Sequence, residues 1–308
     1  MILERYRAQV DLLLKVLPHV AKQKNFALKG GTAINLFEND FPRLSVDIDL
    51  TYLPFKPREE ALQDIQDGLR MIQQNLQSSI KDINVISVPL NKGSDVKLNC
   101  QAPNAQIKIE VNTVTRGHIF PVRFMQLSDT VQEEFGKFAA INVVSHAELY
   151  GGKICAALDR QHPRDLFDIK LLFDNEGFLD EVRKGSVIGF LSHYKPIHEL
   201  IDPIVKDQKS AFDTQFAGMS TIAFSYEDYE TIRQQLIETI KQSLTDNDKS
   251  LIFSFENGEP DWSLYPEKVI KDLPAVQWKL QNIRWLAKNN PAKHKQLILK
   301  LEEVLYGG

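Results

Sequence analysis

The segment LKGGTAINLFENDFPRLSVDIDL, residues 28–50, constrains the fold more than any other part of the chain. In its last five residues, VDIDL, Asp47 and Asp49 alternate with three aliphatic residues. Side chains two apart share one face of a strand, so the aliphatic residues face a core and both carboxylates lie on the opposite face. Two carboxylates about 7 Å apart along a strand repel each other unless a cation lies between them. The segment therefore predicts a strand that binds a metal ion.

The run Gly30-Gly31-Thr32 precedes this strand and has two interpretations. Glycines at a strand-to-helix turn let a ligand approach the backbone, and a helix that begins there directs N–H groups toward an anion such as phosphate. Thr32 then caps the helix or donates its hydroxyl to the same phosphate. The alternative is a tight turn with a capping threonine and no ligand, since short glycine motifs often match by chance.

The glycine turn and the Asp47-x-Asp49 strand together predict a Mg²⁺ and nucleoside triphosphate site. Mg²⁺ takes oxygen ligands, so two carboxylates and triphosphate oxygens would complete its shell. A second Mg²⁺ about 3.5–4 Å away would bridge the attacking hydroxyl. A third carboxylate is expected, and Glu110 in IKIEVNTV lies on the polar face of an alternating strand. It binds the second metal ion, or accepts the proton of the attacking hydroxyl, or simply faces solvent.

The remaining pattern predicts an α+β chain with a mixed sheet flanked by helices, followed by a mainly helical part. We expect an α+β domain over residues 1–140 and a mainly helical domain over residues 141–308. The stretch EEFGKFAAINVV, residues 133–144, is expected to be a loop at this boundary. The other expected elements are an amphipathic helix near the N-terminus with a stripe of Val10, Leu13, Leu14 and Leu17; strands at 26–31, 45–53, 83–90, 95–101 and 106–114; and helices at 32–40, 57–80, 145–160, 162–177, 196–203, 226–243 and 262–306.

Composition excludes several classes of protein. With 43% hydrophobic and 25% charged residues in 308, the chain is expected to be globular, and its net charge of −4 argues against a wholly basic nucleic-acid binder. Two cysteines without paired spacing favour a reduced, cytoplasmic chain. We expect no signal peptide and no membrane partner, since charged residues interrupt every apolar run. From Ser263 onward eight Lys and Arg residues face four Asp and Glu, which suits either RNA contact or a solvated face.

The motifs GGTAINL, PRLSVDIDL and GGKICAALDRQHPRDLFDI occur in this order over roughly the first 175 residues. In this they resemble the AbiEii/AbiGii toxin family of the DNA polymerase β-like nucleotidyltransferase superfamily. The resemblance implies that residues 1–140 form a nucleotidyltransferase domain and that the helical domain contributes Lys153 and Asp165 to the site and binds the acceptor. It also implies that Gly31 and Thr32 contact phosphate and that Asp47 and Asp49 bind metal. It further implies that Lys153 reaches the nucleotide phosphates and that Asp165 or Asp168 is an essential acid.

The later motif has chemistry of its own. Lys153 and Arg160 lie seven residues apart on one helical face, and two cations there can bind a triphosphate or an RNA 3′ end. Pro163 begins the next helix and puts Asp165 in its first turn. Asp165 either interacts favourably with the positive end of the helix dipole, or holds Lys153 or Arg160 in place.

Other candidate sites are weaker. His193 and His198 are not spaced as in a helical zinc motif, and the sequence has no G-x-G-x-x-G or P-loop motif. Trp278 and Trp285 lie seven residues apart and are expected to mark a buried helix stripe; base stacking by either ring is the alternative.

The predicted function is Mg²⁺-dependent transfer of a nucleotide from an NTP to a hydroxyl, with release of pyrophosphate. The resemblance implies that the acceptor is the 3′ end of tRNA, and that the chain is a bacterial toxin encoded beside an antitoxin and linked to phage defence. Transfer to a protein or small-molecule hydroxyl, and a non-catalytic nucleotide-binding module, are the alternatives.

Overall fold

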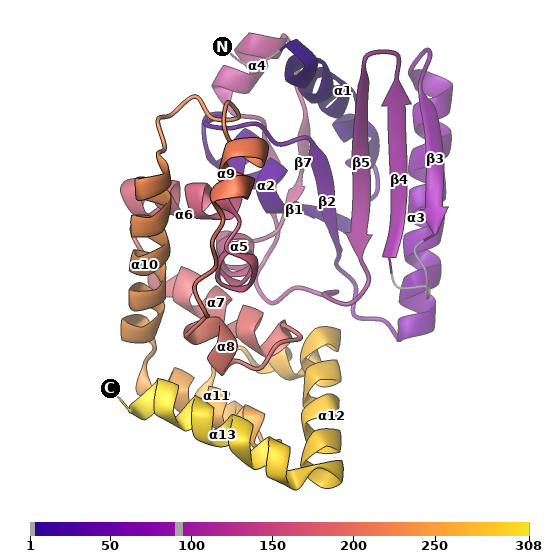
Figure 1. The fold of residues 1–308 in the computed structure, drawn as a ribbon. Helices are drawn as coiled ribbons and strands as arrows, with labels where there is room; N and C mark the ends of the chain where they lie inside the picture. Colours follow the sequence, from indigo (N-terminus) through magenta and orange to yellow (C-terminus); the bar gives the residue numbers. More distant parts are fainter. Residues whose placement is uncertain (1–3, 90–94, 308) are drawn as a thin grey trace. The chain divides into compact units, whose positions relative to one another are not determined.

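The computed structural model describes residues 4–89 and 95–307. It divides into two compact units: unit 1 comprises Met1–Ser145 and Ala217–Ala223, and unit 2 comprises His146–Phe216 and Phe224–Gly308. Unit 1 combines a mixed sheet with helices, and unit 2 is helical in the part that the structure describes (Figure 1). This arrangement confirms the predicted α+β class. Leu90, the last residue of one predicted strand, lies outside the described residues.

Unit 1 is built on a sheet of seven strands in the described residues, in the order β3-β4-β5-β2-β1-β7-β6 (Figure 1). The β2–β5 and β1–β7 pairs are parallel, and the other pairs are antiparallel. Its elements are α1 (Glu4–Val20), β1 (Phe26–Lys29), α2 (Gly30–Ala33), the π-helical η1 (Ile34–Glu38), β2 (Asp47–Tyr52), α3 (Arg58–Ser79), β3 (Asn84–Pro89), β4 (Asp95–Ala102), β5 (Ala105–Asn112), β6 (Arg123–Gln126), α4 (Asp129–Phe135) and β7 (Ala140–Val143).

The alternation in β2 decides which face of the sheet carries the carboxylates. Ile48 and Leu50 are buried, whereas Asp47 and Asp49 are only partly so, as the sequence predicts. Tyr52 continues the buried face, and its hydroxyl donates to an Asp64 carboxylate oxygen on α3 at 2.5 Å. The predicted apolar stripe of α1 is also buried. The aliphatic side of β2 therefore faces α3, and the two carboxylates lie on the opposite side of the strand.

The prediction of a loop over residues 133–144 is wrong. Helix α4 ends there at Gly136, which has a φ of 57°, and β7 follows. Ile141 and Val143 are buried in β7, and Val143 lies opposite Leu28 of β1. A strand of four residues is too short to show a clear period, so long-range pairing with β1 decides its structure.

Unit 2 consists of helices joined by short connections. Its elements are α5 (His146–Arg160), α6 (Pro163–Asn175), α7 (Asp180–Ser192), α8 (His198–Ile201), α9 (Lys209–Gln215), α10 (Tyr226–Ser243), α11 (Asp246–Glu256), the 3-10 helices η2 (Trp262–Leu264) and η3 (Lys268–Asp272), α12 (Pro274–Asn289) and α13 (Pro291–Tyr306). The predicted helices at 145–160, 162–177 and 226–243 are confirmed, whereas α7, α9 and α11 have no counterpart in the prediction. None of the described helices is both long and apolar enough to cross a membrane.

Helices α5 and α7 approach each other unusually closely. A Cβ atom added to Gly151 would lie 2.2 Å from the backbone carbonyl carbon of Gly185, and one added to Gly185 would lie 1.8 Å from the Ala147 oxygen. Only glycine fits such a backbone contact. The GlyGly pair of the GGKICAALDR motif therefore contributes a packing residue, two positions before Lys153.

The prediction that Trp278 and Trp285 mark a buried stripe is wrong. The two side chains are 60% and 65% exposed on α12. The residues that α12 buries are instead Ala275, Val276, Lys279 and Ile283. Lys279 donates from Nζ to the backbone oxygens of Phe190 at 3.0 Å and Lys195 at 2.8 Å. These bonds hold α12 by the side that carries Lys279, not by the side that carries the tryptophans.

Candidate active site

The glycine turn and the acidic strand meet in unit 1. Helix α2 begins at Gly30 directly after β1, and Gly30 has a φ of 74°, where an L side chain is strained. A Cβ atom at Gly30 would lie 2.7 Å from the Asp49 Oδ2 atom. The residue is thus required to be glycine both for its backbone and for the space that the carboxylate takes. The two motifs, about fifteen residues apart in the sequence, share one site.

The residues after Gly30 fasten the turn to the beginning of β2. The Thr32 hydroxyl donates to the Asp47 backbone oxygen and lies 3.0 Å from the Ser45 Oγ atom. A Cβ atom at Gly31 would lie 2.9 Å from both Ser45 Oγ and Arg43 Nη2. The predicted capping role of Thr32 is wrong, because Lys29 occupies the N-cap position and Thr32 lies within the helix. Contact of Thr32 with phosphate stays a prediction.

Arg43 is held by a segment from far along the chain. It is buried, its Nη1 donates to the Leu44 oxygen at 2.7 Å, and its backbone forms a bridge with Ser220. The Leu44 N–H also donates to the Met219 oxygen at 2.9 Å. Residues 217–223 therefore belong to the support of the glycine turn, although the sequence places them among helices.

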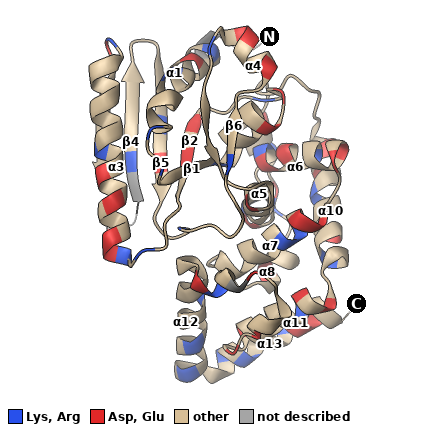
Figure 2. Ribbon diagram, turned by 180° about the vertical axis from the view of Figure 1, so that it is seen from behind, with Lys and Arg blue, Asp and Glu red and all other residues tan. Residues whose placement is uncertain are grey.

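Four charged side chains form one row across the sheet. The register places Lys29 of β1 opposite Asp49, Asp49 opposite Glu110 of β5, and Glu110 opposite Lys97 of β4. The Lys97 Nζ atom lies 2.6 Å from Glu110 Oε2. Figure 2 shows the acidic residues of β2 and β5 in red on these neighbouring strands. A lysine thus stands at each end of a pair of carboxylates.

Lys29 interacts with both carboxylates of the row. Burial lowers the pKa of the Lys29 ammonium group, and the negative charges of Asp49 and Glu110 act in the opposite direction. The Nζ atom also lies 3.4 Å from the Thr115 hydroxyl. Lys29 therefore places a positive charge next to both carboxylates, and this charge reduces the repulsion between them.

The donor set fits a hard divalent cation. Asp47 and Asp49 lie on one face of β2, and carboxylate oxygens are the ligands that Mg²⁺ takes. Among the described residues no group of three or more His, Cys, Asp or Glu side chains is arranged to hold a metal ion. Glu110, ion-paired with Lys97, remains a prediction as the third ligand.

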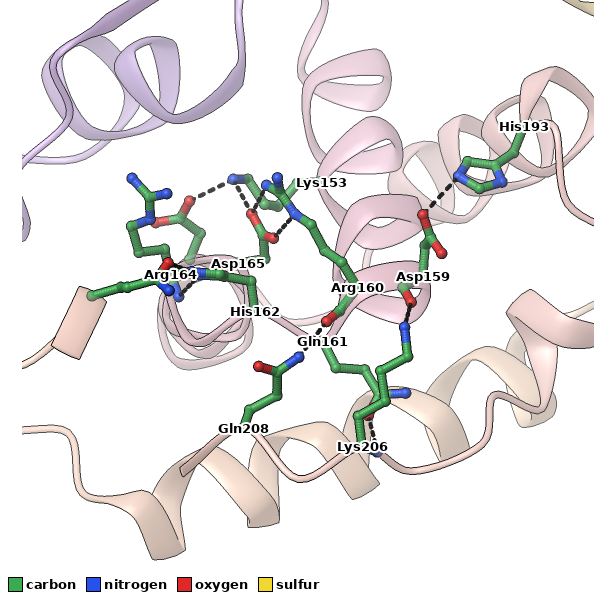
Figure 3. Close-up of polar contacts among 12 residues, drawn as sticks. Lys153, Asp159, Arg160, Gln161, His162, Arg164, Asp165, His193, Lys206 and Gln208 are labelled. Atoms are coloured by element: carbon green, nitrogen blue, oxygen red, sulfur yellow. Dashed lines mark hydrogen bonds and ion pairs between the residues drawn. The ribbon is translucent and has the colours of Figure 1, made fainter. Parts of the chain in front are cut away.

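Unit 2 holds a second group of predicted site residues around Lys153 (Figure 3). Its Nζ atom lies 2.9 Å from an oxygen of Asp165 and 2.9 Å from an oxygen of Asp168, both on α6. Arg160 also binds Asp165, from Nε at 2.5 Å and from Nη2 at 2.9 Å. Lys153, Asp165 and Asp168 are 7%, 1% and 0% exposed, so the lysine joins two buried carboxylates.

Asp165 holds both cations of α5 in place. Burial alone would raise the pKa of this carboxyl, but the charge of Lys153 and the hydrogen bonds from Arg160 outweigh it and hold the pKa well below its ordinary value. Asp165 thus stays ionised while buried. Of its two predicted roles, the contacts favour the holding of Lys153 and Arg160 over a response to the helix dipole alone.

The break between α5 and α6 orients the side chains of Arg160 and Asp165. Gln161 has a φ of 52° and ends α5, while its side chain donates to the Ile204 oxygen at 2.8 Å and accepts from the Lys206 N–H at 2.9 Å. His162 then caps α6 by accepting from the Arg164 N–H at 3.1 Å, and Pro163 begins the helix (Figure 3). Gln208 further donates to the Arg160 backbone oxygen at 2.8 Å.

The sequence profile of the family described as nucleotidyl transferase AbiEii toxin, type IV toxin–antitoxin system, matches residues 11–282. The chain belongs to this family. The match extends well beyond the first 175 residues whose motifs carry the resemblance, and so includes most of the helical unit. It confirms that the chain is a nucleotidyltransferase toxin of a type IV system, and it does not specify the acceptor.

A solved structure shows the same fold. The chain resembles MenT4, a nucleotidyltransferase toxin from Mycobacterium tuberculosis H37Rv, with a TM-score of 0.61 and 14% identity over 90% of this chain and 93% of that one. At this identity the likeness concerns the fold alone. No curated protein sequence matches.

The residues predicted for the site of this AbiEii-family chain do not include Lys29, Lys97, Arg43 or Ser45. The partner of Glu110 could have been found, because a two-residue turn at Pro103 and Asn104 fixes the register of β4 on β5 and brings Lys97 opposite Glu110. The contact of Lys29 with Asp49 depends on the pairing of β1 with β2, which no local turn fixes.

Proposed function

We propose that this chain transfers a nucleotide from an NTP to the 3′ end of tRNA and thereby stops bacterial growth. The observation that carries the proposal is the placement of the Asp49 carboxylate against the Gly30 turn. A polyphosphate at the turn and a cation on the carboxylates would then be neighbours. Family membership supports the reaction class and the type IV toxin–antitoxin system, which includes a cognate antitoxin.

Each residue of unit 1 has a defined task in this proposal. The backbone N–H groups at the start of α2 are directed to the polyphosphate of the NTP in this proposal. Asp47 and Asp49 hold Mg²⁺, which when bound neutralises charge that develops on the phosphate oxygens. Lys29 and Lys97 limit the repulsion among the carboxylates.

The reaction is an in-line displacement at the α-phosphorus. The oxygen of the acceptor hydroxyl forms a bond to this phosphorus, the bond to the β-phosphate oxygen breaks, and pyrophosphate leaves. The hydroxyl proton passes to a carboxylate of the same face, for which Glu110 is the proposed base. Catalysis depends mainly on the positions of these groups and on charge neutralisation.

In unit 2, Arg160 and Lys153 are proposed to bind an anionic group of the substrate. Arg160 is 58% exposed and is therefore the cation that a phosphate in solvent can approach. Lys153 is buried between two aspartates, so its proposed contribution is to fix the arrangement around Arg160 as well as to add positive charge.

The acceptor can be tested directly. Purified protein is incubated with Mg²⁺, total tRNA and each of the four NTPs labelled at the α-phosphate. We expect label on tRNA, and none when EDTA removes the cation. Label that appears on protein alone would contradict the RNA acceptor and favour modification of a protein hydroxyl; no label with any NTP would contradict the proposal.

Replacement of Gly30 by alanine should impair transfer more than stability. The new Cβ would lie 2.7 Å from Asp49 Oδ2, so the carboxylate must move, while the positive φ costs about 1–2 kcal/mol. We expect a loss of transfer of about 100-fold in the labelled-NTP assay, of the size seen when one transition-state contact is removed. Gly136→Ala is the matched control, since its φ is 57° and nothing lies within 4 Å of the added Cβ. Equal activity of the two variants would show that the contact with Asp49 has no function.

A further inference from the structure

Helix α12 presents two tryptophans to solvent on the face opposite its buried side. At 3.6 residues per turn, Trp278 and Trp285 point in nearly the same direction, and Val276, Lys279 and Ile283 point to the other side. The burial agrees, because these three residues are buried and both indole rings are more than half exposed. The outward face is completed by exposed polar side chains, namely Gln281, Asn282, Lys288 and Asn289.

The charged residues of α12, and those of α13 before Glu302, are all basic. Between Asp272 and Glu302 the sequence has six Lys and Arg residues and no Asp or Glu. They are Lys279, Arg284, Lys288, Lys293, Lys295 and Lys300, on α12 and α13. Figure 2 shows the basic residues of these helices in blue. Of these, Lys288, Lys293 and Lys295 are exposed and form no ion pair with a carboxylate in the described part of the chain.

This combination matches the chemistry of a single nucleic-acid strand. Aromatic rings stack on bases regardless of sequence, lysines neutralise phosphates, and amide side chains bond to base edges. The two rings lie about 10 Å apart along the helix axis, which leaves room for two separate bases. A protein partner would also use tryptophan, but Lys279 lies on the buried side and the exposed charged residues of α12, Arg284 and Lys288, are both basic, so such a partner would have to be acidic.

We propose that the outward face of α12, with Trp278, Trp285 and Lys288, binds a single-stranded segment of the RNA acceptor. The inference rests on the proposed function, since it assigns that function's acceptor to a surface. It needs no catalysis, however, and can therefore be tested separately from transfer.

Tryptophan fluorescence provides the test. In a Trp262→Phe background only the two exposed indoles emit, because Trp262 is the third and last tryptophan of the chain. The titration uses a 12-nucleotide single-stranded RNA, without NTP or Mg²⁺, and a duplex RNA of equal length. We expect quenching and binding with the single strand and at least tenfold weaker binding of the duplex, whose bases are already stacked. Equal affinity for both would overturn the proposal.

Substitutions then separate stacking from charge. Each of Trp278→Ala and Trp285→Ala should weaken binding about tenfold, measured by anisotropy of labelled RNA, and Phe at either position should restore most of it. Leu299→Ala, an exposed apolar residue of α13, is the matched control and should bind as the unchanged protein does. Unchanged affinity in the double alanine variant would overturn the proposal. The proposal would also be overturned if the double alanine variant changed only its sedimentation and not its RNA affinity. That result would identify the face as a contact between copies of the chain.

The result remains separable from that of the transfer assay. Binding that follows these expectations while label never reaches RNA would contradict the proposed reaction and retain this surface. If both alanine variants leave transfer to tRNA and RNA affinity unchanged, the proposed reaction is retained and the role of this surface is contradicted.

Discussion

Replacement of Asp49 by asparagine is expected to abolish nucleotide transfer and leave the protein folded. The variant keeps the shape of the side chain against Gly30 but removes one negative charge from the row of Lys29, Asp49 and Glu110. A neutral amide is a poor ligand for Mg²⁺ beside polyphosphate, so the charge on the reacting phosphate is no longer neutralised. We expect a loss of at least about 1,000-fold in the labelled-NTP assay, at the upper end of the effect of removing one transition-state contact.

The control for this variant is Asp67→Asn. Asp67 lies on α3, where its exposed carboxylate pairs with Arg70 at 2.8 Å and accepts from the Gln63 amide at 3.0 Å. It should retain full transfer activity and unfold in urea within about 0.5 kcal/mol of the unchanged chain, as surface substitutions do, and Asp49→Asn should remain folded in the same measurement. Transfer by Asp49→Asn at the rate of the unchanged protein would remove the mechanism. An unfolded Asp49→Asn would instead show that the carboxylate is needed for the fold.

The parts of unit 1 that were predictable are those in which local pattern and burial agree. In β2, aliphatic and acidic residues alternate without interruption, and the structure buries Ile48 and Leu50 as expected. The β4–β5 hairpin is also local, because Pro103 and Asn104 form its turn. Both features are fixed within a few residues along the chain, where period and turn chemistry are informative.

The parts that were not predictable depend on distant segments. Val143 of β7 is a strand residue because it pairs with β1, and Arg43 is ordered by Ser220. The residues near Val143 and Arg43 in the sequence do not indicate that β1 and Ser220 are their partners. The carboxylates of the site could be found from sequence, whereas their basic neighbours Lys29 and Arg43 required the fold.

The tryptophans of α12 show a different limit. A repeat of seven residues is compatible with either face of a helix, so the period alone does not say which side is buried. In the structure the buried side is chosen by Lys279, whose ammonium group is bonded to two backbone oxygens and lies 3.3 Å from Glu256 Oε1. A buried lysine thus overrides the expectation that the largest apolar residues face inward.

Lys153→Met should destabilise the chain by about 3 kcal/mol. The substitution keeps the volume of the side chain and removes the cation between Asp165 and Asp168, which are 1% and 0% exposed. Loss of one member of a buried ion pair costs about 3–5 kcal/mol, and Arg160, which still binds Asp165, keeps the effect at the lower end. Urea unfolding measures the change. Lys170→Met, which breaks the more exposed pair with Asp174 on the same helix, should cost less than about 0.5 kcal/mol.

The cost of Lys153→Met should also depend on pH. The pKa of Asp165 lies below its ordinary value of 3.8 in the folded protein, so this ionised carboxyl stabilises the fold above that value, and the contribution is lost as the pH falls below it. Without Lys153, burial favours the protonated carboxyl, and acid relieves the penalty. The difference in unfolding free energy between the two proteins is therefore largest near neutral pH and becomes smaller from about pH 5 to pH 3. A difference that stays constant over this range would show that the lysine stabilises the fold by packing and not by its charge.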